Sequence, residues 1–279
     1  MTGRCAPLNQ VSGYLSFQGL RVFYRAAEPE GELKHRILCL SSPLTSTFSW
    51  RKLAPELTEL GCLMLMVDLP GFGRSDFDRA LPGDAETRAH LVWGVLDEID
   101  RMTDAPLSTW HLMSQGMGCA IIAAMHRQYP DSVRSQIHIS PMFSPPPPRF
   151  FGGSPEKWCR ETFGEKMPYR AFIEFACGYP MDDYVLDHMY EPMTRADLPA
   201  ALLGILRSPG LLPEKSGDFC PAMAIWGGRD PLLTGSEPQI RRLLPDAERH
   251  VMKNAGHFIT ETHSKALRDY LRGWLHYLE

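Results

Sequence analysis

The chain has 279 residues, of which 44% are hydrophobic and 22% are charged. This is enough apolar side chain for a sizeable buried core in one large α/β domain or two small ones. The formal net charge of -4 is small, and basic residues are scattered among acidic ones rather than gathered into a stripe that could follow a phosphate backbone. Nucleic acid is therefore not expected as a partner.

Neither a membrane segment nor a metal site is expected. The longest apolar run, residues 60–67, falls far short of the roughly 20 residues that span a bilayer, and residues 1–10 lack the apolar stretch of a signal peptide. The cysteines are odd in number and form no C-x-x-C pair, so we interpret them as free thiols. These features predict a cytoplasmic chain without metal or cofactor. The oligomeric state stays open, and a homodimer is compatible with the sequence. The cysteines are Cys5, Cys39, Cys62, Cys119, Cys159, Cys177 and Cys220.

Short strand-like runs alternate with amphipathic segments along most of the chain. Because strands joined by crossover helices form parallel sheets, the predicted fold class is α/β, an eight-stranded, mostly parallel sheet with helices on both faces. Asp84 is placed to cap the second helix. Strands are predicted at residues 14–17, 20–25, 36–41, 63–68, 108–113, 135–140, 222–226 and 250–252, and helices at 50–60, 84–102, 117–128 and 264–278.

The alternation is interrupted once, between residues 141 and 219. Four prolines at 145–148 predict a stiff exit from the sheet. Ser154, followed by Pro155, has the pattern of a helix start, and residues 196–206 predict a further apolar helix. We therefore expect a core of residues 1–140 and 220–279 and a helical cap insertion of residues 141–219 over the sheet edge.

Several segments resemble the α/β-hydrolase superfamily. Residues 63–76, LMLMVDLPGFGRSD, have the strand, aspartate and Pro-Gly-x-Gly turn of that superfamily, and the likeness is closest to the capped branch of epoxide hydrolases and haloalkane dehalogenases. Residues 38–50, LCLSSPLTSTFSW, resemble the loop that supplies an oxyanion-hole N–H in that branch. The resemblance implies an α/β-hydrolase fold over nearly the whole chain outside residues 141–219.

The strand-to-helix turn at residues 114–118 departs from the family. The family has a nucleophile elbow of the form G-x-S-x-G, whereas this chain has Ser-Gln-Gly-Met-Gly, so Gly116 occupies the nucleophile position and offers no attacking atom. Epoxide hydrolases and haloalkane dehalogenases need a carboxylate there, which disfavours both activities. Ser114 is an alternative nucleophile, but we expect it below the tip of the turn, and we expect Cys119 to be a packing residue.

The other two members of a catalytic triad follow in the family's chain order. Asp230, in the segment WGGRDP, resembles the acid that orients the imidazole, and His257, in NAGHF, resembles the general base. The resemblance thus implies an Asp230–His257 dyad beside a missing nucleophile.

The oxyanion hole also departs from the family. The backbone N–H of Met117 matches one donor, but the second donor position falls on Pro43, which has no N–H. The hydroxyl of Ser41 or of Ser42 is the available substitute.

Three functions remain open. The first is a hydrolase acting on a small, mostly apolar ester-like or carbonyl substrate, nearly inactive without its nucleophile because loss of a triad serine costs about 10⁶ in kcat. The second is His/Asp base chemistry without a nucleophile, as in cofactor-free dioxygenases of this fold, or a lyase. The third is a non-catalytic ligand-binding protein that kept the fold.

Overall fold

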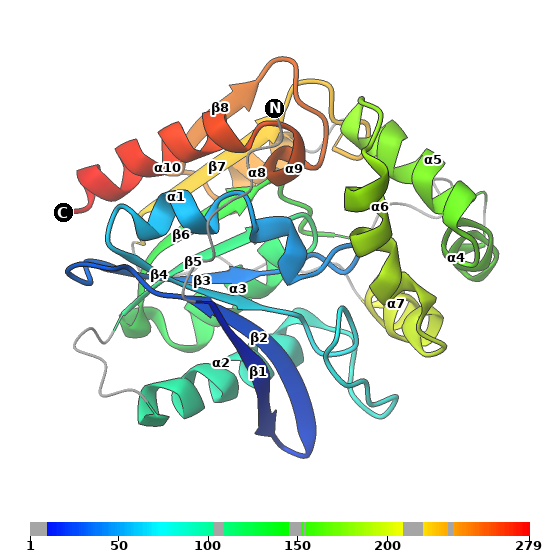
Figure 1. The fold of residues 1–279 in the computed structure, drawn as a ribbon, viewed down its shortest axis with the longest axis horizontal. Coiled ribbons are helices and arrows are strands. Elements are labelled where there is room, and N and C mark those ends of the chain that lie inside the picture. The colour runs from blue at the N-terminus through cyan, green and yellow to red at the C-terminus, as the bar shows by residue number, and fades with distance from the viewer. Residues whose placement is uncertain (1–9, 103–108, 145–151, 153, 209–219, 234–236) are drawn as a thin grey trace.

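The computed structural model describes residues 10–102, 109–144, 152, 154–208, 220–233 and 237–279. At its centre is an eight-stranded sheet with the order β1-β2-β4-β3-β5-β6-β7-β8 (Figure 1). Strand β2 pairs antiparallel with β1 and β4, and the other neighbouring strands pair in parallel. The strands are β1 (Gln10–Phe17), β2 (Leu20–Ala27), β3 (His35–Leu40), β4 (Cys62–Val67), β5 (Trp110–Gln115), β6 (Val133–Ile139), β7 (Ala222–Gly227) and β8 (Glu248–Met252).

This sheet confirms the predicted fold class, and the strand bounds shift by a few residues. The largest shift is at β1, which was expected to begin at residue 14. The β1–β2 hairpin instead pairs from Gln10 with Ala27 to Phe17 with Leu20, because cross-strand hydrogen bonds extend the strand beyond its apolar residues. Residue 108, the predicted start of β5, lies outside the described residues.

Helices cover both faces of the sheet. Alternate side chains of each strand point to opposite faces; in β3, Leu38 and Leu40 belong to one buried core, and Ile37 and Cys39 belong to the other. The first core is covered by α2 (Ala85–Met102), α3 (Gly118–Gln128) and α8 (Glu237–Leu243). The second is covered by α1 (Ala54–Thr58), α9 (Ile259–Thr262) and α10 (Ser264–Tyr277).

The helix expected over residues 50–60 is wrong as a single helix. The structure has a 3₁₀ turn, η1 (Thr47–Trp50), followed by α1, which starts only at Ala54. Ser46 caps η1 by accepting a hydrogen bond from the Phe48 N–H at 3.3 Å. Pro55 then occupies the first turn of α1, where its missing N–H costs no helical hydrogen bond. The predicted cap of α2 is confirmed, since Asp84 Oδ1 accepts from the Thr87 N–H at 2.8 Å.

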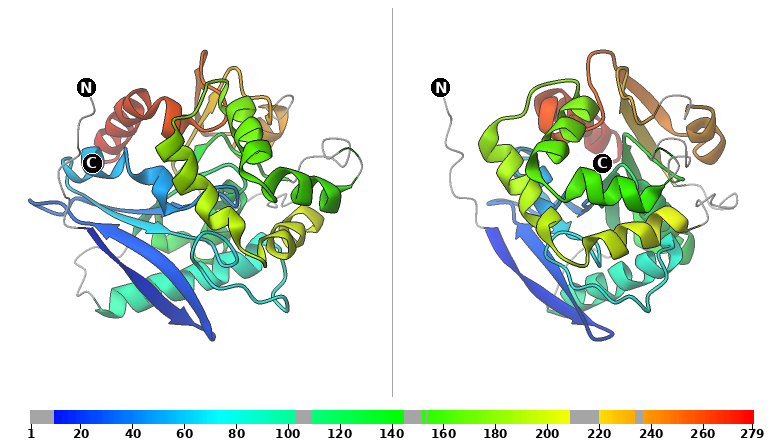
Figure 2. Two further views of the ribbon diagram at one scale, coloured as in Figure 1. Left: turned by 45° about the vertical axis from the view of Figure 1, so that its right-hand side comes forward. Right: turned by 90° about the vertical axis from the view of Figure 1, so that its right-hand side faces the viewer.

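Within the described residues, four α-helices lie between β6 and β7 in the chain and group together on one side of the sheet (Figures 1 and 2). Ser154 caps the first by accepting from the Lys157 N–H at 3.2 Å, and the helix expected at residues 196–206 is the last of the four. The prolines at 145–148 lie outside the described residues. These inserted helices are α4 (Pro155–Phe163), α5 (Lys166–Cys177), α6 (Asp183–Tyr190) and α7 (Leu198–Arg207), with a 3₁₀ turn η4 (Glu191–Thr194) before α7.

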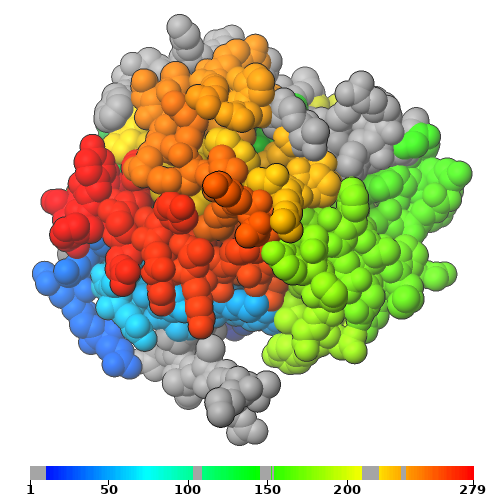
Figure 3. Space-filling model, turned by 90° about the horizontal axis from the view of Figure 1, so that it is seen from above, coloured from blue at the N-terminus to red at the C-terminus, as the bar shows by residue number. Residues whose placement is uncertain are grey.

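The inserted helices pack on loops that follow the carboxyl ends of the strands. The Tyr179 hydroxyl donates to the Asn254 carbonyl at 2.9 Å, next to the loop after β8. The Tyr169 hydroxyl donates to the Leu44 carbonyl at 3.4 Å, in the loop after β3. Figure 3 shows the surface of these helices, in green, directly against that of the C-terminal part of the chain. Within the described residues, no helix has the length and apolar character needed to cross a membrane.

Candidate active site

The sequence-predicted site residues gather at one edge of the sheet. Gly116 follows β5 and precedes α3, Asp230 follows β7, and His257 follows β8. Ser41 and Ser42 follow β3, the neighbour of β5. Because the carboxyl ends of parallel strands meet at one edge, residues more than 200 positions apart in the sequence converge there.

Asp230 and His257 form a buried hydrogen-bonded pair. Oδ2 of Asp230 lies 2.8 Å from Nδ1 of His257, and the two side chains are 1% and 2% exposed. Oδ1 of Asp230 accepts from the Leu232 N–H at 2.9 Å, which fixes the carboxylate. An ionised carboxylate can only accept hydrogen bonds. The neutral imidazole therefore carries its hydrogen on Nδ1 and a lone pair on Nε2, as a general base requires.

Gly116 sits at the tip of the turn with its backbone in the left-handed region, at φ +63°. Its N–H donates to the Ile139 carbonyl at 2.9 Å, which anchors the turn to β6. A Cβ built on Gly116 would lie 3.1 Å from Nε2 of His257 and 3.0 Å from Oγ of Ser42. Nε2 of His257 and the Ser42 hydroxyl thus face the same small space above the turn.

The backbone of His257 is held from the core by residues that the sequence analysis did not single out. Its carbonyl accepts from the Ser140 hydroxyl at 2.8 Å and from Nε2 of Gln115 at 3.2 Å. The Thr260 hydroxyl in turn donates to Oε1 of Gln115 at 2.8 Å. Gln115 ends β5 and Ser140 directly follows the adjacent strand β6; this position at the strand ends is the sequence signal that could have found them.

The inserted helices hold His257 from the other side. The His257 N–H donates to the carbonyl of Ala176, near the end of α5, at 2.7 Å. Gly256 lies so close to α5 that an added Cβ would collide with the carbonyl oxygens of Ala176 and Cys177. The position of α5 is therefore coupled directly to that of His257.

The two serines after β3 differ in what their hydroxyls contact. The Ser41 hydroxyl donates to Oδ1 of Asp68 at 3.3 Å, away from the turn, whereas the Ser42 hydroxyl points toward Gly116. Among the described residues, none accepts a hydrogen bond from the Met117 N–H. The geometry thus leaves Met117 N–H and Ser42 Oγ as polar groups at the turn, beside Pro43, which has no N–H.

Asp68 supports the loops around the site. It accepts from the backbone N–H groups of Thr47 at 2.6 Å and Arg74 at 2.9 Å. Burial raises the pKa of its carboxyl to about 6 although these hydrogen bonds act in the opposite direction. The role of Asp68 is therefore structural.

The side chains of Ser114 and Cys119 are buried and contact neighbouring backbone carbonyls. The Ser114 hydroxyl is buried and donates to the Leu40 carbonyl at 3.1 Å, below the tip of the turn. The Cys119 thiol contacts the Ser114 carbonyl at 3.3 Å, and burial raises its pKa far above the ordinary range of a thiol. Neither group points toward Nε2 of His257.

Aromatic side chains of the inserted helices pack mainly on one another. Trp158 and Phe163 lie edge to face with ring centres 5.2 Å apart, and Phe172 packs on both. Phe163 and Tyr169 are fully or almost fully buried. These rings form the core of the inserted helices.

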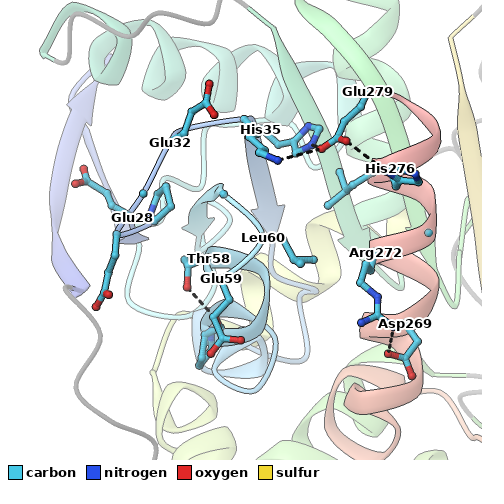
Figure 4. Close-up of a pocket in the computed structure, with 18 residues that line it drawn as sticks. Glu28, Glu32, His35, Thr58, Glu59, Leu60, Asp269, Arg272, His276 and Glu279 are labelled. Atoms are coloured by element: carbon cyan, nitrogen blue, oxygen red, sulfur yellow. Dashed lines mark hydrogen bonds and ion pairs between the residues drawn. The ribbon is translucent and has the colours of Figure 1, made fainter.

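A pair of histidines, His35 and His111, lies at the opposite edge of the sheet. There, a depression of about 1280 Å³ is lined by charged residues that include His35, Glu279 and Arg272 (Figure 4). With a rise of about 3.3 Å per residue, the length of β3 separates His35 from Ser41 by about 20 Å. Among the described residues, no group of three or more His, Cys, Asp or Glu side chains is arranged to hold a metal ion.

An α/β sheet of this topology, with a turn after β5, an acid after β7 and a histidine after β8, defines a hydrolase-type fold. The model of the alpha/beta hydrolase family matches residues 40–270, and the chain belongs to this family.

Known relatives are distant but cover most of the chain. A haloalkane dehalogenase from Mycolicibacterium paratuberculosis is 25% identical over 85% of this chain and 82% of its own length. A 2-hydroxy-6-oxononadienedioate/2-hydroxy-6-oxononatrienedioate hydrolase from Cupriavidus pinatubonensis is 23% identical over 75% of each chain. The solved structure of the epoxide hydrolase CorEH superposes with a TM-score of 0.79 at 16% identity, covering 97% of this chain and all of that one.

Proposed function

We propose that this chain hydrolyses a small, mostly apolar ester-like or carbonyl substrate, with the Asp230–His257 dyad as general base. One observation carries the proposal: Nε2 of a buried, carboxylate-bound histidine lies 3.1 Å from the Cβ position of the elbow residue. The substrate would lie between the elbow and the inserted helices, and residues 141–219 would form its cap.

In this mechanism His257 Nε2 takes the proton of the attacking hydroxyl as the new bond to the carbonyl carbon forms. Asp230 keeps Nδ1 protonated and stabilises the imidazolium that results. The N–H of Met117 donates to the oxygen on which negative charge develops. His257 then returns the proton to the leaving group. Gly116 supplies none of the reacting atoms, so the attacking oxygen comes from elsewhere.

The relatives support hydrolysis as the type of reaction, but they do not identify the substrate. Their printed names include a dehalogenase and a hydrolase of an oxo compound. Dehalogenation does not carry over, because that branch attacks with a carboxylate at the position of Gly116. A carbonyl substrate needs only a base, an oxygen nucleophile and an oxyanion donor.

Nucleophile-independent base chemistry is the second candidate. The dyad is intact while residue 116 presents no side-chain atom, which is the arrangement that direct proton abstraction from a substrate requires. The two candidates predict different results for Gly116→Ser. The substitution should raise the rate of ester hydrolysis, but it should not raise the rate of direct proton abstraction.

The test compares hydrolysis of 4-nitrophenyl acetate by the wild type, His257→Ala, Gly116→Ser and the Gly116→Ser/His257→Ala double variant at matched concentration. We expect a slow wild-type rate that falls to the uncatalysed rate in His257→Ala, and a higher rate in Gly116→Ser that also requires His257. Rates that are indifferent to His257 in both backgrounds, or no hydrolysis by any variant, would contradict the proposal.

A further inference from the structure

We propose that Ser42 Oγ is the nucleophile, so that the attacking hydroxyl comes from the loop after β3 instead of from the elbow. This inference rests on the proposed function, because it names the attacking oxygen of that reaction. It also explains why residue 116 is a glycine, which leaves room for the Ser42 hydroxyl.

The first support is direction. Oγ of Ser42 lies 3.0 Å from the Cβ position of Gly116, while Cβ of Ser42 lies 3.7 Å from it, so the hydroxyl points to the elbow. Nε2 of His257 lies 3.1 Å from the same point. A hydroxyl and the lone pair of a base therefore face one space that is small enough for a single reacting group.

The second support is the state of the hydroxyl. Ser42 is only 4% exposed, yet among the described residues its hydroxyl has no hydrogen-bond partner. The neighbouring hydroxyls of Ser41 and Ser114 are committed to Asp68 and Leu40. Oγ of Ser42 is not one of the fully buried polar atoms that lack a partner, so it stays accessible to water or to a substrate.

The third support is the rigidity of the loop. The Ser42 carbonyl accepts from the Thr45 N–H at 2.9 Å and from the Thr45 hydroxyl at 3.2 Å. Pro43 follows and restricts its own φ to about -65°. The main chain of Ser42 is thus held in place, and rotation about its Cα–Cβ bond is the freedom by which Oγ can approach Nε2. Catalytic hydrogen bonds commonly tighten in this way only when substrate binds.

Gly116 fits this arrangement because a side chain there would crowd both groups. Its Cβ would be within 3.0 Å of Ser42 Oγ and 3.1 Å of His257 Nε2, which is tighter than ordinary carbon contacts. Glycine leaves the path from Ser42 to His257 open. The residue that removes the family's nucleophile therefore makes room for another one.

The reaction with an ester balances without any co-reactant other than water. Ser42 Oγ forms a bond to the carbonyl carbon and gives its proton to His257 Nε2. The bond from carbon to the leaving oxygen breaks, and the leaving alcohol takes the proton from His257. Water, deprotonated by His257, then attacks the acyl-Ser42 ester, which releases the carboxylic acid and restores the Ser42 hydroxyl.

A biotin-linked alkyl fluorophosphonate tests this without knowledge of the natural substrate. Ser42 Oγ would bond to phosphorus, fluoride would leave, and the hydroxyl proton would pass to His257 Nε2. The intact chain is treated with the probe and digested, and the modified peptide is sequenced by mass spectrometry. The variants are Ser42→Ala, His257→Ala and Ser114→Ala, the last being a matched control because Ser114 Oγ faces the Leu40 carbonyl.

We expect one adduct, at Ser42, that is lost at least 100-fold in Ser42→Ala and His257→Ala and is unchanged in Ser114→Ala. Because the site is mapped in the wild type, a folding defect in a variant cannot produce or hide this result. Absence of an adduct, or an adduct at another residue, would overturn the inference.

The same variants separate this inference from the proposed function. If Ser42→Ala lowers ester hydrolysis but no adduct forms at Ser42, the hydroxyl is an oxyanion donor and the nucleophile inference is wrong while the function stands. If ester hydrolysis does not depend on His257, the proposed function itself fails.

Discussion

Two buried histidine sites lie at opposite edges of the same sheet and differ in their partners. At the carboxyl edge, Nδ1 of His257 lies 2.8 Å from the Asp230 carboxylate. At the amino edge, Nε2 of His111 lies 3.2 Å from Nδ1 of His35, and Nδ1 of His111 lies 2.8 Å from the Ser135 hydroxyl. Burial, with a smaller effect from His35, lowers the pKa of His111 to about 3. His257 thus pairs with a buried carboxylate, whereas the partners of His111 are a second imidazole and a hydroxyl.

The largest effect is expected from removing that carboxylate. In Asp230→Asn the amide can donate to Nδ1, which favours the tautomer with hydrogen on Nε2 and removes the lone pair from the elbow. We expect kcat/KM for 4-nitrophenyl acetate to fall by about 10³–10⁴-fold. Asp76→Asn is the matched control, since Asp76 pairs with the exposed Arg21 and should leave the rate unchanged. A fall of less than tenfold in Asp230→Asn would remove the distinction between the two histidine sites.

A smaller effect is expected where α5 contacts the loop that carries His257. In Gly256→Ala the new methyl group collides with the carbonyls of Ala176 and Cys177. We expect a loss of about 1–3 kcal/mol in the free energy of unfolding, measured by urea denaturation, together with slower ester hydrolysis.

Gly273→Ala in α10 is the matched control. Nothing lies within 4 Å of a Cβ at Gly273, so this change should stabilise the protein by about 0.4–1 kcal/mol. Equal stability of Gly256→Ala and the wild type would show that α5 does not hold the base loop as described.

The third effect is the pH dependence of stability from the histidines without carboxylates. Burial lowers the pKa of His111 and of His138 to about 3, from 6.5 in the unfolded chain. Between those values the unfolded chain binds protons that the folded chain does not. The contribution of His111 and His138 to the free energy of unfolding is therefore fully present above pH 6.5. It is lost as the pH falls toward 3, by up to about 1.4 kcal/mol per pH unit for each ring.

This effect can be isolated with one substitution. His111→Asn should flatten the decline of the unfolding free energy between pH 7 and pH 5 relative to the wild type. His90→Asn changes an exposed histidine on α2 and should leave the slope unaltered. Parallel slopes for His111→Asn and the wild type would show that His111 binds protons in the folded state.

The sequence predicted the sheet, because each strand carries its own apolar run and each connection its own turn or helix signal. It also identified the segments of Asp230 and His257, because short strings next to strand ends mark them. It could not choose between Ser41 and Ser42. Successive residues point in opposite directions, and only the packing of β3 against β4 decides that Ser41 meets Asp68.

Contacts between distant segments were also beyond the sequence. Gln115 and Ser140 look like ordinary strand-end residues until β8 and its loop bring the His257 carbonyl against them. The helix expected at residues 50–60 failed for a local reason, since its pattern does not show that a 3₁₀ turn capped by Ser46 precedes Pro55.

The most direct test of the central claim is the protonation of the His257 ring, measured by ¹⁵N NMR of the wild type at pH 7–8. The account predicts a protonated Nδ1 and an unprotonated Nε2 for His257, and reversal of this tautomer in Asp230→Asn. A ring that carries its hydrogen on Nε2 in the wild type would contradict the account, because it could not accept a proton at the elbow.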